Sequence, residues 1–521
     1  MKKRFAWITA GILLLAAFGC RREGIDVPDE ALVGRVKPVV SKISPAGILF
    51  NDAGFGLKVI AGESFLNDSY CLYIDDRQLA ATAQPDYWRQ QLNWIIPKEL
   101  LGELTASASG GSTFCSVRIT AIDPSYDISG DFDRYRDYVS EPVVLEIRRG
   151  ATRFSAPKLL FPQWKHSGEP VIRCQAQGNL YLAWHEQTGG IAQAFFSSSS
   201  DLGENWTQVL NVSRSAEMVT EVDLRADDAG HVYMAWQEGY GEATRVFFSR
   251  SLNGGATWLL PRRMNAEGAR ARKPVLDIND RGDVSIAWYQ GEYPADLGLR
   301  LAVSRDLGKS WETRDFALPK SYYGSEQPVL ISGPGGMVDL LSGCYPDSGV
   351  TGFYCFHSRD YGGSWQAREL ATNPVYPFHG YARARSCLGP ESQAYVVWGD
   401  SSHLGHLAWT GNYFMRRESS GVDWSAIQDF NEICRTNGEK TALSADGDRV
   451  DVALAQAGGL FLLRSGDTGR SWALPEFIPG ADCFACSGSP DMARHPAGKT
   501  FLVYVRSAGP DERSLVLLSF E

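Results

Sequence analysis

Carboxylates stand at repeated positions in this sequence and are suited to acid–base chemistry. Glu186 and Glu238 each end a strand-like run, LYLAWHE and VYMAWQE, and Glu221 begins the run EVDLRA. In glycoside hydrolysis one carboxylic acid protonates the leaving oxygen, and a second carboxylate acts as nucleophile or base. Glu186, Glu221 and Glu238 are therefore the catalytic candidates. The sequence does not fix their separation, so a retaining or an inverting outcome stays open.

Other side chains near the ends of the same runs are of types that bind polar ligands. Histidines, carboxylates, an arginine and a tyrosine together suit ligands that stack and hydrogen-bond, such as sugars. An ordinary solvated rim is the alternative for any one of them. The ligand-binding candidates are His185, Tyr240, Arg272, Glu292, His379 and Asp400.

A turn motif recurs between residues 199 and 472 and indicates which elements position these residues. The pattern S-x-D-x-G-x-x-W occurs four times, with one Asn variant and one degenerate copy that ends at Trp424. The acidic or amide side chain can accept backbone N–H bonds, and glycine allows a left-handed conformation. The Asp or Asn and Trp positions of the five clear copies are Asp201 and Trp206, Asn253 and Trp258, Asp306 and Trp311, Asp360 and Trp365, and Asp467 and Trp472.

This motif resembles the Asp-box, or bacterial neuraminidase, repeat. In that family the box lies on the turn between the third and fourth strands of a propeller blade, away from the ligand face. The resemblance therefore implies that the box residues are structural and not catalytic.

The repeat predicts an all-β fold in which residues 149–521 form a β-propeller. Each unit of about 50 residues contains four strand-like runs, which correspond to one blade. There are seven copies of the first half of the repeat, and the last ends at SLVLLSFE without a fourth strand. Phe154-SAPKLLF is predicted to supply that strand, with Phe154 at the Trp position. We therefore predict seven blades, with six as the alternative.

The Asp-box resemblance raises sialidase activity, but the arginine pattern does not support it. That family clamps the substrate carboxylate with arginines, and its first arginine lies in an R-I-P motif, where this chain has Gly168. Arg272-Lys-Pro274 is similar but lies in the wrong blade, and no Tyr/Glu nucleophile pair can be assigned. The arginines that share one column of the first strands are expected to bridge blades, and they are Arg173, Arg225 and Arg385.

Residues 37–148 lack the repeat and predict a small β-sandwich. Alternating runs such as LKVIAGESF, LNWIIP and FCSVRITAI are separated by turn residues. The segment resembles an IPT/TIG immunoglobulin-like domain, which implies a spacer or a partner surface. Its acidic stretch 123–142 is expected to be a solvated loop, with calcium binding through Asp131 and Asp133 as the alternative.

The first residues predict an address in the cell envelope. Lys2, Lys3 and Arg4 precede an apolar stretch that ends in Ala17-Phe18-Gly19-Cys20. This resembles a bacterial lipoprotein signal, which implies removal of residues 1–19, acylation of Cys20 and a tether over 20–36. Arg21 after the cysteine favours the outer membrane, and ordinary secretion is the alternative.

Charge and cysteine counts restrict the partners. The net charge of −10 with no basic block makes nucleic acid a poor partner. Three disulfides are considered, namely Cys71 with Cys115, Cys344 with Cys355 and Cys483 with Cys486. No metal or cofactor is predicted.

The sequence thus favours a surface-anchored lipoprotein whose propeller binds a carbohydrate or a surface protein, with an exo-acting, sialidase-like glycoside hydrolase as the alternative.

Overall fold

A computed structural model of the chain describes most of residues 152–521 and parts of the preceding region. The described N-terminal residues are 35, 37–38, 40–44, 47–50, 55–61, 70–75, 77–79, 91–106, 112–121 and 132–150. The described C-terminal residues are 152–291, 298–318, 327–344, 352–370, 384–404, 407–419, 423–430, 433, 440–456, 459–480, 489–509 and 512–521.

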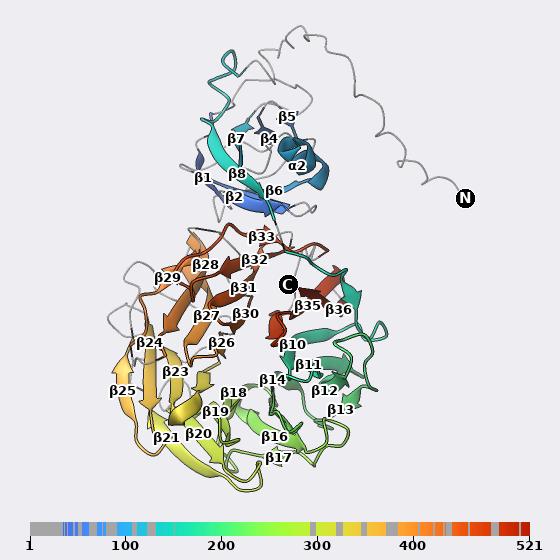
Figure 1. Cartoon of the computed structure of the whole chain (residues 1–521), viewed down its shortest axis with the longest axis vertical. Helices are drawn as coiled ribbons and strands as arrows, with labels where there is room; N and C mark the ends of the chain where they lie inside the picture. The colour runs from blue at the N-terminus through green and yellow to red at the C-terminus, as the bar shows by residue number, and fades with distance from the viewer. Residues whose placement is uncertain are drawn as a thin grey trace, which may run out of the picture.

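Residues 152–521 form a ring of seven four-stranded antiparallel blades, as the repeat predicted (Figure 1). In each blade the first strand lies at the axis and the fourth lies at the rim. The first three blades are β10(Ser167–Cys174), β11(Leu180–Thr188), β12(Ile191–Ser199) and β13(Leu210–Asn211); β14(Val219–Ala226), β15(Val232–Glu238), β16(Arg245–Ser251) and β17(Arg262–Arg263); and β18(Ala271–Ile278), β19(Val284–Gln290), β20(Gly298–Ser304) and β21(Glu312–Ala317).

The remaining four blades have the same antiparallel order. They are β22(Val329–Ser332), β23(Val338–Cys344), β24(Gly352–Ser358) and β25(Gln366–Glu369); β26(Arg385–Leu388), β27(Ala394–Leu404), β28(Leu407–Arg417) and β29(Gln428–Asp429); β30(Thr441–Asp446), β31(Arg449–Gln456), β32(Gly459–Ser465) and β33(Glu476–Phe477); and β34(Asp491–Arg494), β35(Thr500–Gly509), β36(Glu512–Phe520) and β9(Lys158–Leu159). Two short 3-10 helices, η1(Gly241–Ala243) and η2(Pro334–Gly336), lie in connections.

The last blade closes the ring with a strand from the start of the propeller. Leu159 pairs with Val516 and Lys158 with Leu517, so β9 is the outer strand of the C-terminal blade. Phe154 bridges to Phe520, and their ring centroids lie 5.4 Å apart. The predicted closing strand and the place of Phe154 are therefore confirmed, and the closure pairs an edge of β36 that would otherwise be open.

The core of the ring lies between neighbouring blades. Trp184, Trp236, Trp288 and Trp398 occupy one column of the second strands and are fully buried. Three of these tryptophans, Trp184, Trp236 and Trp398, stack on an aromatic ring of the third strand, as Trp236 does on Phe247 with an interplanar angle of 13°. They are thus packing residues, and none of them is exposed to a ligand.

The turns of each blade divide between two faces of the ring. In several blades the turn after the first strand contacts the Asp-box turn of the same blade: Gly254 N donates to Gly230 O at 2.9 Å, and Tyr361 N donates to Gly336 O at 2.8 Å. We call the face with these turns the box face. The opposite face carries the connections between second and third strands and between blades, and we call it the open face.

The N-terminal region forms two sheets that share one buried core. One sheet contains β1(Val40–Ser44), β3(Phe55–Ala61) and β6(Gln91–Ile96), and the other contains β2(Gly47–Phe50), β8(Val143–Arg149), β7(Thr113–Thr120), β4(Cys71–Ile74) and β5(Arg77–Gln78). The two-sheet arrangement agrees with the predicted sandwich. The helix α2(Lys98–Thr105) was not foreseen, although Leu100, Leu101 and Leu104 have helical spacing.

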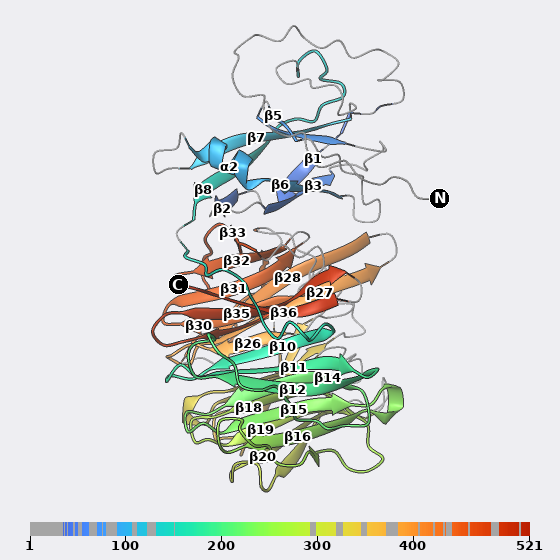
Figure 2. The same ribbon diagram turned by 90° about the vertical axis from the view of Figure 1, so that its right-hand side faces the viewer.

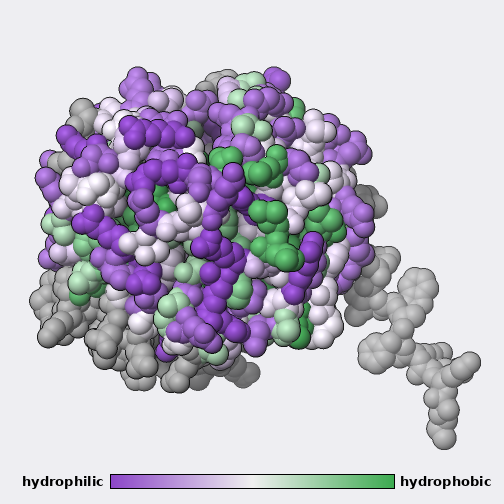
Figure 3. Space-filling view, turned by 90° about the horizontal axis from the view of Figure 1, so that it is seen from below, coloured by the Kyte–Doolittle hydropathy of each residue, from purple (hydrophilic) through white to green (hydrophobic). Residues whose placement is uncertain are grey.

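The N-terminal module is joined to the rim of the propeller and does not stand apart from it. β2 runs parallel to the outer strand β33 and pairs with it at Leu49 and Glu476. Phe461 and Phe477 of this blade belong to the same buried cluster as Leu57 and Ile147 of the module. Figure 2 shows the module stacked on the edge of the ring. At the opposite end, the rim is largely hydrophilic, with hydrophobic residues gathered mainly in one group (Figure 3).

Two of the disulfides considered from the sequence are wrong. Cys71 packs with Tyr73 on one side of its sheet, whereas Cys115 lies in the core cluster on the other side, and neither cysteine forms a disulfide. Cys355 is also a free buried thiol, because it pairs in register with Leu341 while Cys344 pairs with Gly352. Cys20, Cys483 and Cys486 lie outside the described residues.

Candidate functional site

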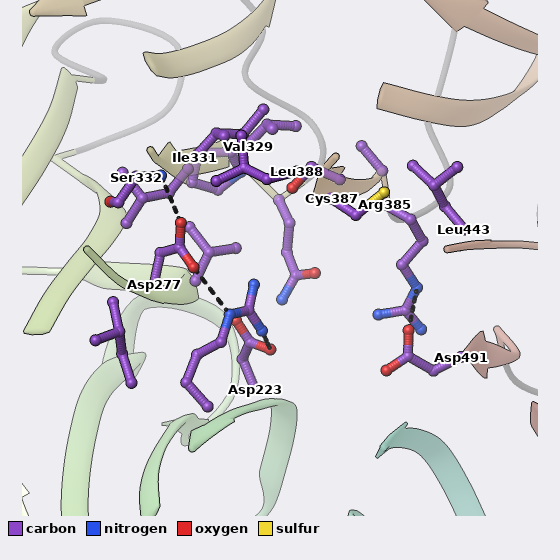
Figure 4. Close-up of a pocket in the computed structure, with 18 of the residues that line it drawn as sticks. Asp223, Asp277, Val329, Ile331, Ser332, Arg385, Cys387, Leu388, Leu443 and Asp491 are labelled. Carbon is purple, nitrogen blue, oxygen red and sulfur yellow. Dashed lines mark hydrogen bonds and ion pairs between the residues drawn. The ribbon is translucent and has the colours of Figure 1, made fainter. Parts of the chain in front are cut away.

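The first strands of the blades surround a cavity on the axis of the ring. Its volume is about 280 Å³, and all seven inner strands contribute to its lining (Figure 4). One part of the wall is charged and comes from β10, β14, β18, β26 and β34. Another part is apolar and includes Val329, Leu330 and Ile331 of β22. A cavity of this kind offers a ligand hydrogen bonds and apolar contact at the same time.

A chain of ion pairs runs along the charged wall. Asp491 accepts from Arg173 Nη1 at 2.7 Å, and Arg173 Nη2 lies 3.5 Å from Asp223 Oδ1. Arg225 lies 3.0 Å from the same Asp223 oxygen and 3.2 Å from Asp277 Oδ1. Four blades are therefore linked in sequence by alternating carboxylates and guanidinium groups.

The same three aspartates also bind the backbone of the next inner strand. Asp223 Oδ2 accepts from Leu276 N at 2.8 Å, and Asp277 Oδ2 accepts from Ser332 N at 2.5 Å. Asp491 Oδ2 accepts from Ile172 N at 3.0 Å, across the closure of the ring. Each carboxylate thus holds two adjacent blades together, which fixes the wall of the cavity.

Two of these carboxylates have pKa values that are displaced in opposite directions. Burial raises the pKa of Asp277, and this effect exceeds the opposing influence of Arg225. Burial also disfavours the charged form of Asp491, but Arg385 and Arg173 outweigh it and lower the pKa of Asp491. Carboxylates whose surroundings separate their pKa values are the usual arrangement for acid and base roles.

The arginine column expected from the sequence lines this cavity, and each member faces a carboxylate. Arg385 lies 3.8 Å from Asp491 and donates to Pro490 O at 2.9 Å. Because Arg173 and Arg225 are also paired with aspartates, the three guanidinium groups bridge blades and balance three negative charges. A substrate carboxylate would have to displace these partners, so the column does not form a ready carboxylate clamp.

The three glutamates proposed as catalytic candidates do not line the cavity. Glu186 is buried and accepts from His166 N at 2.7 Å and from the Ser167 hydroxyl, and burial raises its pKa. Glu238 is also buried and accepts from Trp236 Nε1 at 2.8 Å. Glu221 lies in β14 with a φ of 53° at a bulge of that strand.

The ligand-binding candidates fall at different places. The imidazole of His185 lies directly over Gly168, where a Cβ atom would come within 2.3 Å of Nε2, so any larger residue there would displace the imidazole. Tyr240 stands on the open face between β15 and β16 with 86% of its surface exposed. Arg272 pairs in register with Tyr289 at the start of β18. Asp400 lies in β27, but its side chain is outside the described part of the chain, as are the residues Glu292 and His379.

The Asp-box side chains hydrogen-bond within their own turns. Asp201 Oδ1 accepts from Asn205 N at 2.8 Å and from Ser199 Oγ at 2.7 Å, and these bonds lower the pKa of Asp201 to about 2. Ser199 Oγ also accepts from Gly203 N at 2.9 Å. The boxes of Asp306, Asp360 and Asp467 repeat this arrangement, and Asn253 reproduces it with an amide.

Sequence reasoning missed the three cavity aspartates, although a signal was present. Asp223 and Arg225 are two residues apart on one strand, so their side chains point to the same side. Asp277 stands at the position of Arg225 in the next repeat, and Asp491 stands at the position of Asp223. Complementary charges at these two positions of the repeat therefore indicate the chain of aspartates and arginines that lines the cavity.

Potential metal ligands are scattered over the described part of the chain. No group of three or more His, Cys, Asp or Glu side chains there is arranged to hold a metal ion. Asp133 is among those residues, whereas Asp131 is not. The described helices include none that is long and apolar enough to cross a membrane.

Comparison with known proteins finds similarity only among solved structures, because no family model and no curated protein sequence matches the chain. A protein of unknown function from Dyadobacter fermentans is 13% identical with a TM-score of 0.42, over 71% of this chain and 99% of that one. The polysaccharide lyase Uly1 is 10% identical with a TM-score of 0.48, over 68% and 89%. Trypanosoma rangeli sialidase in complex with DANA is 12% identical with a TM-score of 0.42, over 68% of this chain and 55% of the sialidase. The structural similarity is thus to β-propellers that include a polysaccharide lyase and a sialidase.

Proposed function

We propose that the open face of the propeller binds a carbohydrate. The observation that carries this proposal is the axial cavity, in which donors and acceptors of both charge signs stand on five of the seven inner strands beside an apolar wall. A sugar presents hydroxyl groups that donate and accept, together with apolar C–H faces. A rigid wall that offers both kinds of contact loses little conformational entropy when such a ligand binds.

Tyr240 supports the open face as the side of approach. Its ring is 86% exposed, and Met218, which is 44% exposed, is held beside it because Gly239 N donates to Met218 O at 2.9 Å. A tyrosine combines an apolar ring with a hydroxyl group, which suits it to contacts with a partly polar ligand. We assign Tyr240 to the outer part of the binding surface.

We place binding ahead of hydrolysis because the described carboxylates of the cavity are already engaged. Asp223, Asp277 and Asp491 each accept a hydrogen bond from a backbone N–H group. Each of them also forms an ion pair with at least one arginine. The glutamates first considered for catalysis lie outside the cavity lining. A bound sugar therefore meets a surface whose polar groups are fixed in place.

The proposed setting is the cell envelope. We propose that Cys20 is acylated after removal of residues 1–19 and that the chain is held at the outer membrane. In that setting the ligand is an extracellular polysaccharide or the glycan of a surface protein. Metabolic labelling with a radioactive fatty acid tests this, with Cys20→Ser as the variant that should lose the label.

The test of binding is retention of the full chain, solubilised in detergent, on an array of glycans. We expect retention on one group of related glycans and release of no reducing ends from the same glycans in solution. If no glycan retains the protein, the proposal is wrong. Release of reducing ends would favour the second candidate.

The second candidate is glycoside hydrolysis, and the opposite pKa shifts of Asp277 and Asp491 favour it. In that mechanism Asp277, whose pKa is raised, is the acid, and Asp491, whose pKa is lowered, is the base or nucleophile. The test is release of reducing ends by the wild type, Asp277→Asn and Asp491→Asn. If the wild type releases reducing ends and both variants fail to do so, while circular dichroism shows that both variants are folded, hydrolysis takes place in this cavity.

A further inference from the structure

A groove on the rim, at the seam between the last and first blades, is separate from the axial cavity. Its volume is about 510 Å³, within the range of roughly 300–1,000 Å³ that is typical of small-ligand sites. It is lined by residues 158–164, which include β9, and by residues 206–209, which follow the first Asp-box. We propose that this groove is a second binding site and that its ligand is a neutral saccharide. This inference does not depend on the function of the open face.

An aromatic ring that is present at three other seams is absent from this seam. At three other seams a box tryptophan packs edge-on against a phenylalanine of the preceding blade: Trp258 on Phe196, Trp311 on Phe248 and Trp472 on Phe414, each at 5.0 Å. These phenylalanines also approach the box glycines Gly255, Gly308 and Gly469 closely.

The equivalent residue at this seam is Leu517. It approaches the box glycine Gly203 as the phenylalanines approach theirs. It also pairs with Lys158, just as Phe196 pairs with Leu210 in the first blade. A leucine fills less space than a phenylalanine, so the rim stays open beside Trp206.

Aromatic rings form the floor of the groove. Phe161 stacks on Trp184 at 5.1 Å with an interplanar angle of 10° and meets Trp206 edge-on at 6.0 Å. Trp164 packs on Phe195 at 4.6 Å. Phe161 adopts a left-handed φ of 48° and closes a turn in which Trp164 N donates to Phe161 O at 2.9 Å. This turn holds the rings of Phe161 and Trp164 in fixed positions.

Neutral polar groups border these rings. Gln163, Thr207 and Gln208 are exposed at the edge of the groove. The indole N–H of Trp164 is buried and has no acceptor among the described residues. A buried indole N–H normally finds a partner, so a hydroxyl oxygen that entered the groove would satisfy it.

The charge of the groove argues for a neutral ligand. Among the described residues that line it, Lys158 alone is charged, and its Nζ atom donates to Gly203 O at 2.9 Å and lies 3.7 Å from the carboxylate of Glu204. The ammonium group is therefore engaged and is balanced by a carboxylate. Flat aromatic rings bordered by amides and a hydroxyl match a pyranose, whose C–H face packs on a ring while its hydroxyl groups reach the amides.

The test uses isothermal titration calorimetry of the full chain in detergent with cellopentaose, laminaripentaose, xylopentaose and a proline-rich decapeptide. All variants carry Tyr240→Ala, so that a contribution of the open face does not obscure the rim. Leu517→Phe should add a ring behind Trp206 and narrow the groove without unfolding the protein, because phenylalanine occupies the equivalent position at three other seams. Trp164→Ala removes part of the floor. Leu260→Ala, on the rim of another blade, is the matched control.

We expect one of the pentasaccharides to bind the Tyr240→Ala protein, and its Kd to rise at least tenfold in Leu517→Phe and Trp164→Ala but not in Leu260→Ala. Equal binding by all four proteins would overturn the assignment of the site. Binding of the decapeptide without any saccharide would overturn the assignment of the ligand, and so would the absence of binding by every probe. Loss of open-face binding on a glycan array would leave this result unchanged, so the two proposals fail separately.

Discussion

Asp491 combines the features that define the cavity at the scale of single residues. Its carboxylate is 6% exposed, contacts two arginines and binds the backbone of the first blade. Removing one partner from a buried pair leaves the other charge without compensation. The cavity wall therefore depends on this side chain for stability, whatever the ligand is.

Asp491→Asn is expected to lower the free energy of unfolding at pH 7 by about 3–5 kcal/mol, because Arg173 loses its nearest buried carboxylate. The matched control is Asp315→Asn, which breaks an exposed pair with Arg300 and should cost less than about 1 kcal/mol. Urea unfolding measures both. Equal losses in the two variants would contradict the role assigned to Asp491.

The two displaced carboxylates should respond to pH in opposite directions. The pKa of Asp491 is lowered in the folded state, so its stabilising effect is present above about pH 4 and is lost as the pH falls through the folded value. The pKa of Asp277 is raised, so the wild type should lose stability relative to Asp277→Asn as the pH rises above about 4. Thermal unfolding of the wild type, Asp491→Asn and Asp277→Asn between pH 3 and pH 7 checks both trends. If the melting temperatures of the two variants change with pH in parallel, both trends are refuted.

At the scale of elements, the Asp-box turn packs closely against the preceding blade because a glycine stands at the point of contact. A Cβ atom at Gly255 would lie 2.0 Å from the ring of Phe196, whereas one at Gly254 would meet only the Tyr181 hydroxyl at 3.9 Å. Both glycines have positive φ values. Both positions therefore require a left-handed backbone, but only a side chain at Gly255 would collide with Phe196.

Gly254→Ala is expected to cost about 1–2 kcal/mol, from the left-handed backbone alone. Gly255→Ala should cost about 1–3 kcal/mol more, because the added methyl group also displaces Phe196. Equilibrium unfolding in urea separates the two contributions. If Gly254→Ala is as damaging as Gly255→Ala, the collision with Phe196 is not what matters.

Sequence periodicity predicted these elements well and the contacts between blades poorly. The S-x-D-x-G-x-x-W spacing located the turns because their hydrogen bonds are local, as between Ser199 and Asp201. The pairing of Asp491 with Arg173 joins two residues that lie at opposite ends of the propeller sequence and has no local signature. Helix α2 was missed because its leucines fit a strand-rich interpretation equally well over such a short segment.

At the scale of the whole molecule, the ring is closed by residues that precede the first blade. Leu160 N donates to Leu515 O at 2.9 Å, and the Leu160 side chain is 3% exposed in the core between the last and first blades. The N-terminal module adds β2 to the outer strand β33 and shares its core with Phe461 and Phe477. The propeller thus receives strands from its N-terminal side at two of its blades.

Leu160→Ala is expected to lower the free energy of unfolding by about 2–5 kcal/mol, because it leaves a cavity where the ring closes. Leu260→Ala, at a side chain that is 77% exposed on another blade, should change it by less than about 0.5 kcal/mol. Limited proteolysis should also cut Leu160→Ala faster than Leu260→Ala. Similar stability and cleavage rates would show that this strand does not secure the ring.

The most direct test of carbohydrate binding by the open face is the Kd of the glycan that the array selects, measured for the full chain and for Tyr240→Ala. We predict at least a tenfold rise in Kd for Tyr240→Ala, because the variant removes the most exposed aromatic ring of that face among the described residues. Leu517→Phe, which changes the rim, should leave this Kd unchanged. Failure of the array to retain the wild type, or the same Kd for Tyr240→Ala and wild type, would contradict the proposal.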